Sequence, residues 1–377
     1  MPPSYDLSIS RRTRRTPYTD RITAAGVKAY TVYNHMLLAT VFDSIVEDYH
    51  HLKNHVQVWD VACERQIEVR GADAARLIQM LTPRDLRSMT PGQCYYTPMV
   101  DETGGMLNDP VTIKLDEDRF WVSIADSDLL FWIKGIAYGL RLEVDVREAD
   151  VWPLAVQGPK ADDLVARIFG DYAREIRFFR GTMMPFHGVD LFVARSGYSK
   201  QGGFEIYVQG TEIAHPIWDA LFEAGEDLDV SAGGPNLIER IEGGLLSYGN
   251  DMTAENTPHE CGLDRFCQVE QAIGCVGRDA LLRVCQEGPI RQIRSLAIEG
   301  DAVTPCIDPW PVVVAGETIG RITSAAWSPD FETNVAIGMI RMPHWDDGSC
   351  VEVVTPDGTR PAVVKENTFA SSRNSPA

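Results

Sequence analysis

Hydrophobic side chains recur at helical spacing in several stretches of the first 250 positions. Apolar residues placed three and four positions apart predict helices that bury one face. The predicted helices cover residues 42–56, 73–81, 129–140, 161–169, 213–224 and 236–248. The segment that precedes residue 42 is expected to form a loop leading into the first of these helices.

Short apolar runs bounded by turn residues predict the strands. In the first 210 positions these runs cover residues 66–69, 93–99, 110–114, 120–124, 152–156, 191–195 and 204–208. After about residue 288 the chain changes to six short runs at 293–298, 310–314, 319–323, 335–339, 350–354 and 362–364. Short strands separated by turns in this way are typical of a compact antiparallel β domain. The pattern therefore predicts an α+β chain that ends in such a domain.

The length and charge of the chain limit its class. With 377 residues, two or three domains are expected. The formal net charge of −19 argues against a nucleic-acid or anionic-membrane partner, because both need a basic surface. The sequence has no apolar run of roughly 18 residues, which a membrane-spanning helix requires. We expect a protein that acts on small molecules.

The eight cysteines are spread along the chain without a CxxC pair. Four arginines at positions 11, 12, 14 and 15 are not followed by an apolar segment, so a secretion signal is not expected. We therefore predict reduced thiols and a cytoplasmic location. No cysteine or histidine ligands stand at the spacing of a zinc site, and no bound metal is expected.

A double glycine marks the first candidate site. Gly104 and Gly105 allow a sharp turn that delivers a polar pair, Asn108 and Asp109, to the start of the next strand. Asp109 is therefore a candidate ligand contact. The alternative is that this acid only caps the backbone of the turn.

A glycine-rich hairpin over residues 195–207 marks the second. Side chains alternate along a strand, so Glu205 and Tyr207 are expected on one face. A carboxylate there can accept two hydrogen bonds from the edge of an amino-pyrimidine. The alternative is an ordinary exposed acid on a strand.

Two further groups leave both a structural and a functional interpretation open. Arg240 and Glu242 are too close in sequence to share a helix face, so each is expected to pair with a different partner. Aromatic residues gather at 30–33, 95–96 and 178–179. Their faces can hold a cation, although aromatic residues are also common in cores.

Taken together, these stretches resemble the aminomethyltransferase family, whose founding member is the T-protein of the glycine cleavage system. The resemblance covers nearly the whole chain and rests on the order and spacing of short pieces at residues 59–61, 104–109, 154–159, 195–198, 203–205, 240–242, 248–252, 276–281, 322–324 and 328–329.

The resemblance implies three domains around a central folate channel, with a C-terminal antiparallel β-barrel. The implied division is 1–65 with 150–235, 66–149 with 236–288, and 289–377. Tetrahydrofolate is the implied co-substrate. Asp109 matches the family acid near the reactive folate nitrogen and is the implied catalytic residue. Glu205 matches the residue that grips the pterin, and Tyr96, Tyr198 and Arg195 are the other implied folate contacts.

The chain departs from the T-protein pattern where the reacting atoms are expected. Asn108 replaces the first of two acids, and residues 122–125 and 262–265 also differ. Pieces at 8–12, 31–36, 58–66 and 199–203 look more like the dimethylsulfoniopropionate demethylase branch of the family. That likeness implies direct transfer of a methyl group from a sulfonium to N5 of tetrahydrofolate. The implied products are 5-methyltetrahydrofolate and 3-(methylthio)propionate, and no lipoyl carrier protein is expected.

A sulfonium donor needs alignment and a wall that tolerates its charge. Tyrosine and phenylalanine faces suit a cation at about 0.5–2 kcal/mol each. Tyr33, Phe179 and Tyr207 are the candidates for this wall, and Ser123 is a candidate hydrogen-bond donor to the substrate carboxylate or a water. Asp109 is expected to orient folate or to stabilise the charge that develops on N5.

Three alternatives stay open from the sequence. The same wall would accept an ammonium, so the donor could be a betaine or dimethylglycine. An ordinary glycine cleavage T-protein would need a lipoyl carrier as its partner. A folate-binding protein without catalysis, like superfamily members that act in iron–sulfur cluster maturation, is the third, but their Lys-Gly-Cys-Tyr-x-Gly motif is missing here.

Overall fold

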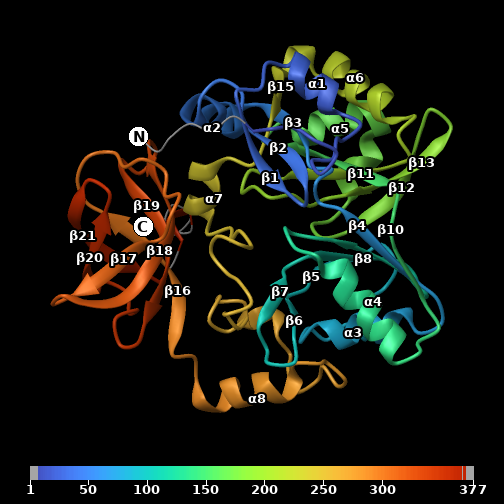
Figure 1. Ribbon diagram of the computed structural model, residues 1–377. Helices are drawn as coiled ribbons and strands as arrows, with labels where there is room; N and C mark the ends of the chain where they lie inside the picture. The colour runs from blue at the N-terminus through green and yellow to red at the C-terminus, as the bar shows by residue number, and fades with distance from the viewer. Residues whose placement is uncertain (1–6, 367, 371–377) are drawn as a thin grey trace.

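The computed structural model describes residues 7–366 and 368–370. A six-stranded sheet, a five-stranded sheet and a closed six-stranded barrel build the molecule, together with two small two-stranded sheets. Figure 1 shows the two open sheets on one side and the barrel on the other, with a short helix and long connecting segments between them. The α+β class and the C-terminal barrel expected from the sequence are confirmed.

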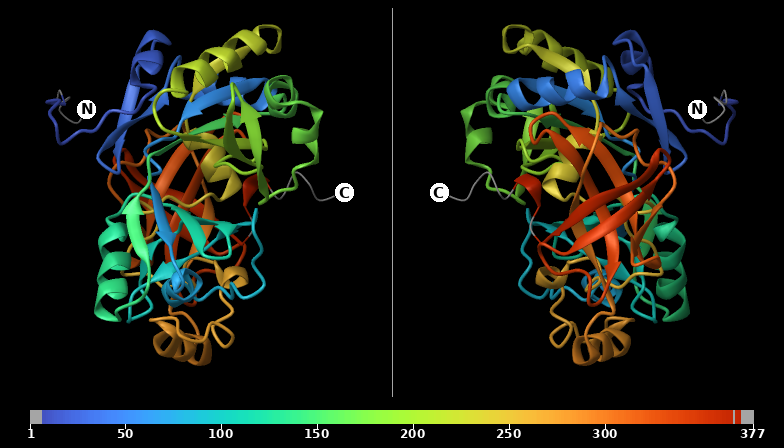
Figure 2. Two further views of the ribbon diagram at one scale, coloured as in Figure 1. Left: turned by 90° about the vertical axis from the view of Figure 1, so that its right-hand side faces the viewer. Right: turned by 90° about the vertical axis from the view of Figure 1, so that its left-hand side faces the viewer.

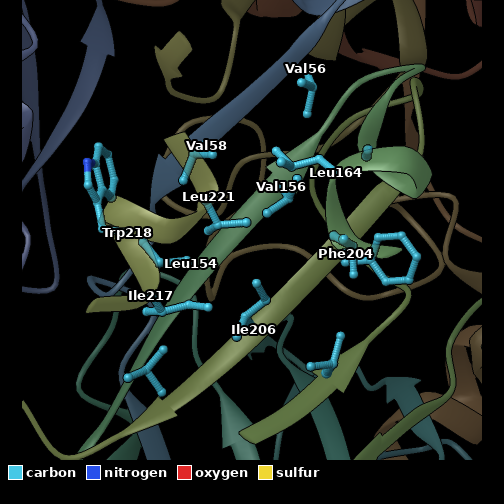
Figure 3. Packing of buried hydrophobic residues seen from close by; sticks show 14 of the residues in the cluster. Val56, Val58, Leu154, Val156, Leu164, Phe204, Ile206, Ile217, Trp218 and Leu221 are labelled. Carbon is cyan, nitrogen blue, oxygen red and sulfur yellow. The ribbon is translucent and has the colours of Figure 1, made fainter. Parts of the chain in front are cut away.

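The six-stranded sheet has the order β12-β13-β14-β11-β3-β15 and is antiparallel except where β15 runs parallel to β3. Helices α5 (Ala161–Phe169) and α6 (Ala214–Ala224) bury their apolar faces against it. Figure 3 shows this core, in which Val156 and Ile206 on the sheet meet Leu164 and Leu221 on the helices. The strands are β3 (Val56–Asp60), β11 (Val151–Gln157), β12 (Gly181–Phe186), β13 (Val189–Ala194), β14 (Gly203–Gln209) and β15 (Val230–Gly233).

A hairpin precedes this sheet where the sequence predicted only a loop. Strands β1 (Ala29–Tyr33) and β2 (Met36–Val41) pair antiparallel after the short helix α1 (Thr19–Ala24). Asn34 and His35 form the turn with φ angles of 49° and 64°, the left-handed region that two-residue hairpin turns require. Helix α2 (Ile45–Asn54) follows, capped by the Ser44 hydroxyl.

The five-stranded sheet has the order β10-β4-β9-β8-β5 and is covered by α3 (Ala74–Leu81) and α4 (Leu129–Gly139). The predicted pairing of runs 110–114 and 120–124 is confirmed by the antiparallel β8–β9 ladder. The strands are β4 (Gln66–Arg70), β5 (Cys94–Tyr96), β8 (Val111–Asp116), β9 (Arg119–Ser123) and β10 (Asp145–Glu148). The two-stranded sheet of β6 (Met99–Val100) and β7 (Met106–Asn108) comes between β5 and β8 in the sequence.

Helix α7 (Leu237–Gly243) is shorter than the predicted helix over 236–248. The prediction was wrong at its C-terminal end because Gly244 takes a φ of 64° and closes the helix through its backbone N–H. Asn236 caps the other end by accepting from the N–H groups of Ile238 and Glu239. Figure 1 shows α7 between α2 and the barrel.

The barrel closes in the order β16-β19-β18-β17-β20-β21, and its interior is filled by aliphatic side chains together with Trp310. All six predicted runs of the C-terminal region fall within its strands. Figure 2 shows the barrel in front of the other units in its right-hand view. The strands are β16 (Arg291–Ile298), β17 (Trp310–Val314), β18 (Glu317–Ser328), β19 (Thr333–Arg341), β20 (Cys350–Thr355) and β21 (Gly358–Lys365).

The remaining helices are short or lie apart from the sheets. Helix α8 (Arg278–Glu287) leads into the barrel, and three 3-10 turns cover Asp171–Glu175, Glu226–Leu228 and Asp264–Phe266. Among the helices in the described part of the chain, none is both long and apolar enough to cross a bilayer.

Candidate functional site

The double-glycine turn is held rigidly. Gly104 has a φ of +82°, and a Cβ on Gly105 would come within 2.3 Å of the Ala254 carbonyl oxygen. Asp101 Oδ1 accepts from the N–H groups of Thr103 and Gly105 at 2.8 and 2.9 Å. The turn thus fixes where the following residues, Asn108 and Asp109, enter the molecule.

Asn108 uses both ends of its amide to hold the segment after β9. Its Nδ2 donates to the Ala125 carbonyl oxygen at 3.0 Å and to Ser127 Oγ at 2.8 Å. Its Oδ1 accepts from the Ala125 N–H at 2.9 Å. An aspartate here could not donate to the carbonyl, so these bonds explain why the position carries an amide.

Asp109 has one satisfied and one unsatisfied oxygen. The Tyr96 hydroxyl donates to Oδ2 at 2.8 Å, whereas Oδ1 is buried without a hydrogen-bond partner. Burial raises the pKa of Asp109 to about 7, against the opposing effect of the Tyr96 hydrogen bond. A buried, unpaired carboxylate oxygen is costly unless a ligand donates to it. Asp109 can therefore exchange a proton near neutral pH.

Glu205 on β14 is only 6% exposed, so it is not an ordinary surface acid. Ser196 Oγ donates to its Oε2 at 2.5 Å, and the Tyr207 hydroxyl donates to the same oxygen at 3.0 Å. Burial raises the pKa of Glu205, while these two hydrogen bonds lower it. The predicted common face of Glu205 and Tyr207 is confirmed.

Tyr207 is buried among other rings. Its ring centroid lies 6.0 Å from that of Trp121 and 5.8 Å from that of Phe192. Phe179 is half-buried against the same cluster and meets the exposed Phe178 edge to face at 4.5 Å. The structure thus brings Phe179 and Tyr207 into one aromatic group.

Tyr33 and Ser123 belong to different sheets, and both lie near Glu64. Tyr33 ends β1, and burial followed by the charges of Glu64 and Asp109 raises its pKa. Ser123 ends β9, accepts from Gln66 Nε2 at 2.8 Å and lies 3.4 Å from Glu64 Oε2.

Glu64 is a site residue that the sequence reasoning did not single out. It lies in the turn between β3 and β4, and burial together with the charge of Glu205 raises its pKa. Burial is the main cause of the raised pKa of Tyr33 and of Tyr207, and the charge of Glu64 adds to both shifts. The residue stood in the sequence only as one letter of a family-like piece, and no local pattern distinguishes it from a surface acid.

Tyr198 and Arg195 differ in how their polar groups are used. The Tyr198 hydroxyl donates to the carbonyl oxygens of Leu245 and Leu246 at 3.1 and 2.8 Å. Burial raises the pKa of Tyr198, and the charge of Asp109 adds to this shift. The Arg195 guanidinium binds Asp162 at 2.8 Å and also donates to the carbonyl oxygens of residues 174 and 176. These bonds engage all three nitrogens, so a folate contact by Arg195 stays a prediction.

Arg240 and Glu242 have different partners, as expected. Arg240 forms a buried ion pair with Asp251 at 2.9 Å and donates to Ser324 Oγ on the barrel at 2.6 Å. Glu242 accepts from the Tyr49 hydroxyl at 2.9 Å and from Ser328 Oγ. Both residues thus join α7 to strand β18.

Two surface cavities are present, and Trp121 and Phe192 of the aromatic group around Tyr207 line one of them. One of ≈ 420 Å³ is lined by barrel and C-terminal residues, and one of ≈ 350 Å³ lies between strands of the two open sheets. Neither lining includes Glu64, Asp109 or Glu205. We place the candidate site at these carboxylates, where a buried Asp109 oxygen without a partner and raised pKa values coincide.

Two family models match the chain. Residues 18–271 match the GCVT N-terminal domain, and residues 291–370 match the glycine cleavage T-protein C-terminal barrel domain. The crystal structure of the glycine cleavage system aminomethyltransferase T from Bartonella henselae superposes with a TM-score of 0.85 at 24% identity. The match covers 95% of this chain and 98% of that one, and it supports the fold alone.

Two relatives match most of the chain but differ in sequence identity. Dimethylsulfoniopropionate demethylase DmdA of Ruegeria pomeroyi is 58% identical over 95% of this chain and 97% of its own length. An aminomethyltransferase of Symbiobacterium thermophilum is 29% identical over 88% of this chain and 90% of its own.

Proposed function

The chain belongs to the glycine cleavage T-protein family, and we propose that it is a tetrahydrofolate-dependent demethylase of dimethylsulfoniopropionate. The methyl group passes directly to N5, giving 5-methyltetrahydrofolate and 3-(methylthio)propionate. The observation that carries this proposal is the 58% identity with the demethylase of Ruegeria pomeroyi over nearly the full length of both chains.

The residues of the site fit a reduced pterin. Asp109 Oδ1 is a buried acceptor without a partner, and Glu205 is a second buried acceptor whose orientation two hydroxyls fix. Pterins present N–H donors along one edge, which carboxylates bind well. Asp109, Glu205, Tyr96 and Tyr198 would hold the co-substrate.

The residues of this chain position the methyl donor and tetrahydrofolate and supply a proton acceptor. Bound tetrahydrofolate supplies N5, whose lone pair takes the methyl group. Both electrons of the broken carbon–sulfur bond stay on sulfur, and the methylated N5 then loses its proton. Asp109 Oδ1 can accept that proton because its pKa lies at about 7. Tyr33, Phe179 and Tyr207 form the wall around the donor, and Ser123 hydrogen-bonds its carboxylate or a water.

The proposal includes further expectations for the chain. They are the three-domain division at residues 1–65 with 150–235, 66–149 with 236–288, and 289–377, a cytoplasmic location, and independence from nucleic acid and from a lipoyl carrier. Residues 1–6, 367 and 371–377 of that division lie outside the described residues.

A methyl-transfer assay tests the function. The purified protein is incubated with tetrahydrofolate and one donor at a time: dimethylsulfoniopropionate, glycine betaine, dimethylglycine or an aminomethylated lipoyl carrier protein. We expect 5-methyltetrahydrofolate only with the sulfonium. Turnover of an ammonium instead would replace the proposed donor, and release of ammonia from an aminomethylated lipoyl carrier would make the chain an aminomethyltransferase. Binding of tetrahydrofolate without turnover of any donor would favour a binding protein.

A further inference from the structure

Three side chains between α7 and the barrel form a hydrogen-bonded row that the proposed function does not use. Cys285 Sγ lies 3.4 Å from Nε2 of His259, and Nδ1 of the same ring lies 2.6 Å from Oδ1 of Asp264. The row therefore runs from a thiol through an imidazole to a carboxylate. Where a cysteine acts as a nucleophile, this order places a base beside the sulfur and an acid behind the base.

The backbone around His259 is fixed by a closed turn. Glu260 Oε2 accepts from the Thr257 N–H at 3.0 Å, and Thr257 Oγ1 accepts from the Glu260 N–H at 3.3 Å. Glu260 also forms an ion pair of 2.9 Å with Arg291 at the start of β16. The His259 carbonyl oxygen accepts from the Gly262 N–H at 3.2 Å, and the His259 side chain is only 10% exposed. The imidazole is therefore held in its orientation toward the sulfur.

The partners of the imidazole decide which of its nitrogens carries a hydrogen. The hydrogen bond from His259 lowers the pKa of Asp264, so this carboxylate is ionised at neutral pH and can only accept. Nδ1 of His259 therefore carries a hydrogen, and Nε2 of the neutral ring has the lone pair that faces the sulfur. Burial, together with the charges of Asp264 and Glu270, raises the pKa of Cys285. The sulfur thus keeps its hydrogen at neutral pH and donates it to Nε2.

The sulfur is open to reagents from solution. Cys285 lies in the last turn of α8 and is exposed, and Cys350 is the other exposed cysteine of the eight. Neither of the two cavities described above includes Cys285 in its lining. A small electrophile that needs no shaped pocket therefore fits this place best. A hydroperoxide also uses the imidazole, because its leaving oxygen is strongly basic and needs a proton.

We propose that Cys285 is a site at which hydroperoxides oxidise this protein, with His259 transferring the proton. Nε2 of His259 takes the thiol proton while sulfur attacks the terminal oxygen of the peroxide. The O–O bond breaks, its electron pair leaves with the alkoxide, and His259 gives its proton to that oxygen. Sulfur is oxidised to a sulfenic acid, and the hydroperoxide is reduced to an alcohol. Asp264 is a positioning residue that fixes the ring, and no residue of the proposed folate or donor site takes part.

The test compares two exposed cysteines within one molecule. The reduced full-length protein is treated with tert-butyl hydroperoxide at pH 7.5 in excess dimedone, which traps sulfenic acids, and peptide mass spectrometry follows the labelling. Cys350 is the internal reference, because its sulfur contacts a carbonyl oxygen, that of Gly348 at 3.9 Å, in place of an imidazole. We expect Cys285 to be labelled roughly tenfold faster or more. Equal rates would overturn the proposal without any variant.

Substitutions then identify the base. His259→Ala should slow labelling of Cys285 to about the rate of Cys350, whereas His50→Ala, at an exposed histidine, should leave it unchanged. Asp264→Asn should slow it several-fold, because the amide can also donate and then favours the other tautomer of the ring. Asp264→Glu should restore part of the rate, because a carboxylate again accepts from Nδ1. A folded His259→Ala protein that keeps the wild-type rate would show that exposure alone controls the reaction, and the proposal would be wrong.

Discussion

Asn34 and Asn108 donate to the same acceptor, the carbonyl oxygen of Ala125, at 3.1 and 3.0 Å. Asn34 follows Tyr33 at the tip of the β1–β2 hairpin, and Asn108 precedes Asp109. One peptide group therefore ties the proposed donor wall to the proposed catalytic acid, although the two segments belong to different sheets.

Replacing Asn108 by aspartate should break this connection. The new carboxylate can accept from the Ala125 N–H but faces the Ala125 carbonyl oxygen without a donor. We expect a loss of about 1–3 kcal/mol in the free energy of unfolding, measured in urea, and a fall in kcat. The exposed Asn250→Asp is the matched control and should change neither quantity. Unchanged stability in Asn108→Asp would show that the shared acceptor is unimportant.

Asp109→Asn should abolish proton acceptance while preserving the contact with Tyr96, because the amide oxygen still accepts its hydrogen bond. We expect kcat to fall by about 100-fold or more, the usual contribution of a positioned base. The wild-type kcat should rise with pH through about 7, since the carboxylate must be ionised to take a proton and is protonated below that pKa.

Stopped assays between pH 5.5 and 9 would record this profile, with donor and tetrahydrofolate both saturating. The Asp109→Asn profile should be flat across the same range. If the variant keeps most of the wild-type kcat, Asp109 orients the folate but does not take its proton.

Glu205→Gln should weaken folate binding. The amide oxygen can still accept from Ser196 and Tyr207, so the packing is kept and mainly the charge is lost. Hydrogen bonds to a charged group are worth about 1.5–3 kcal/mol, which corresponds to a loss of roughly 10–100-fold in affinity. The rise in melting temperature caused by tetrahydrofolate reports this loss. The exposed Glu212→Gln is the control, and an unchanged rise in Glu205→Gln would remove Glu205 from the site.

Two substitutions at Tyr207 distinguish its two proposed roles. Its ring is proposed to line the donor pocket, and its hydroxyl donates a hydrogen bond to Glu205. Tyr207→Phe keeps the ring, so the tetrahydrofolate Kd should rise about three- to tenfold through loss of one hydrogen bond, with little change in the donor KM. Tyr207→Ala also removes the ring, and there the sulfonium KM should rise more than the folate Kd. Tyr138→Phe, at a position 88% exposed, is the control. Equal losses for both ligands in Tyr207→Ala would contradict the assigned wall.

Asp251→Ala should destabilise the attachment of the barrel. Its removal leaves Arg240, whose side chain is 8% exposed, as a buried charge without its ion-pair partner. Breaking a buried pair in this way typically costs about 3–5 kcal/mol, measurable by urea unfolding. The exposed pair Arg167–Asp227 offers the comparison, and Asp227→Ala should have little effect. Similar losses in the two variants would mean that burial does not govern the strength of this pair.

Elements with clear local signals were predictable from the sequence. The helix expected over 161–169 is α5 to the residue, because a turn precedes it and Gly170 ends it. The six barrel strands were found because their apolar runs are short and separated by turn residues. In both cases the information lies within a few neighbouring positions.

The hairpin and Glu64 could not be found in this way. On β1, Tyr30 and Val32 are 39% and 51% exposed, so this strand does not show the apolar and polar alternation by which strands are recognised. Glu64 becomes distinctive only when β1, β9 and β14 converge around it, and no local pattern encodes that convergence. The helix over 236–248 was overextended because the apolar spacing continues past the glycine pair that ends α7.

The order of strands in the six-stranded sheet also constrains how the protein can be made. Leu154 on β11 pairs with Asp60 on β3, and the segment between them builds the whole five-stranded sheet. A ribosome must therefore finish that insertion before the first sheet can close, and contacts between residues this far apart in sequence form slowly. Nascent chains that stop short of β11 would expose β3 as an unpaired apolar edge, the kind of intermediate on which chaperones act.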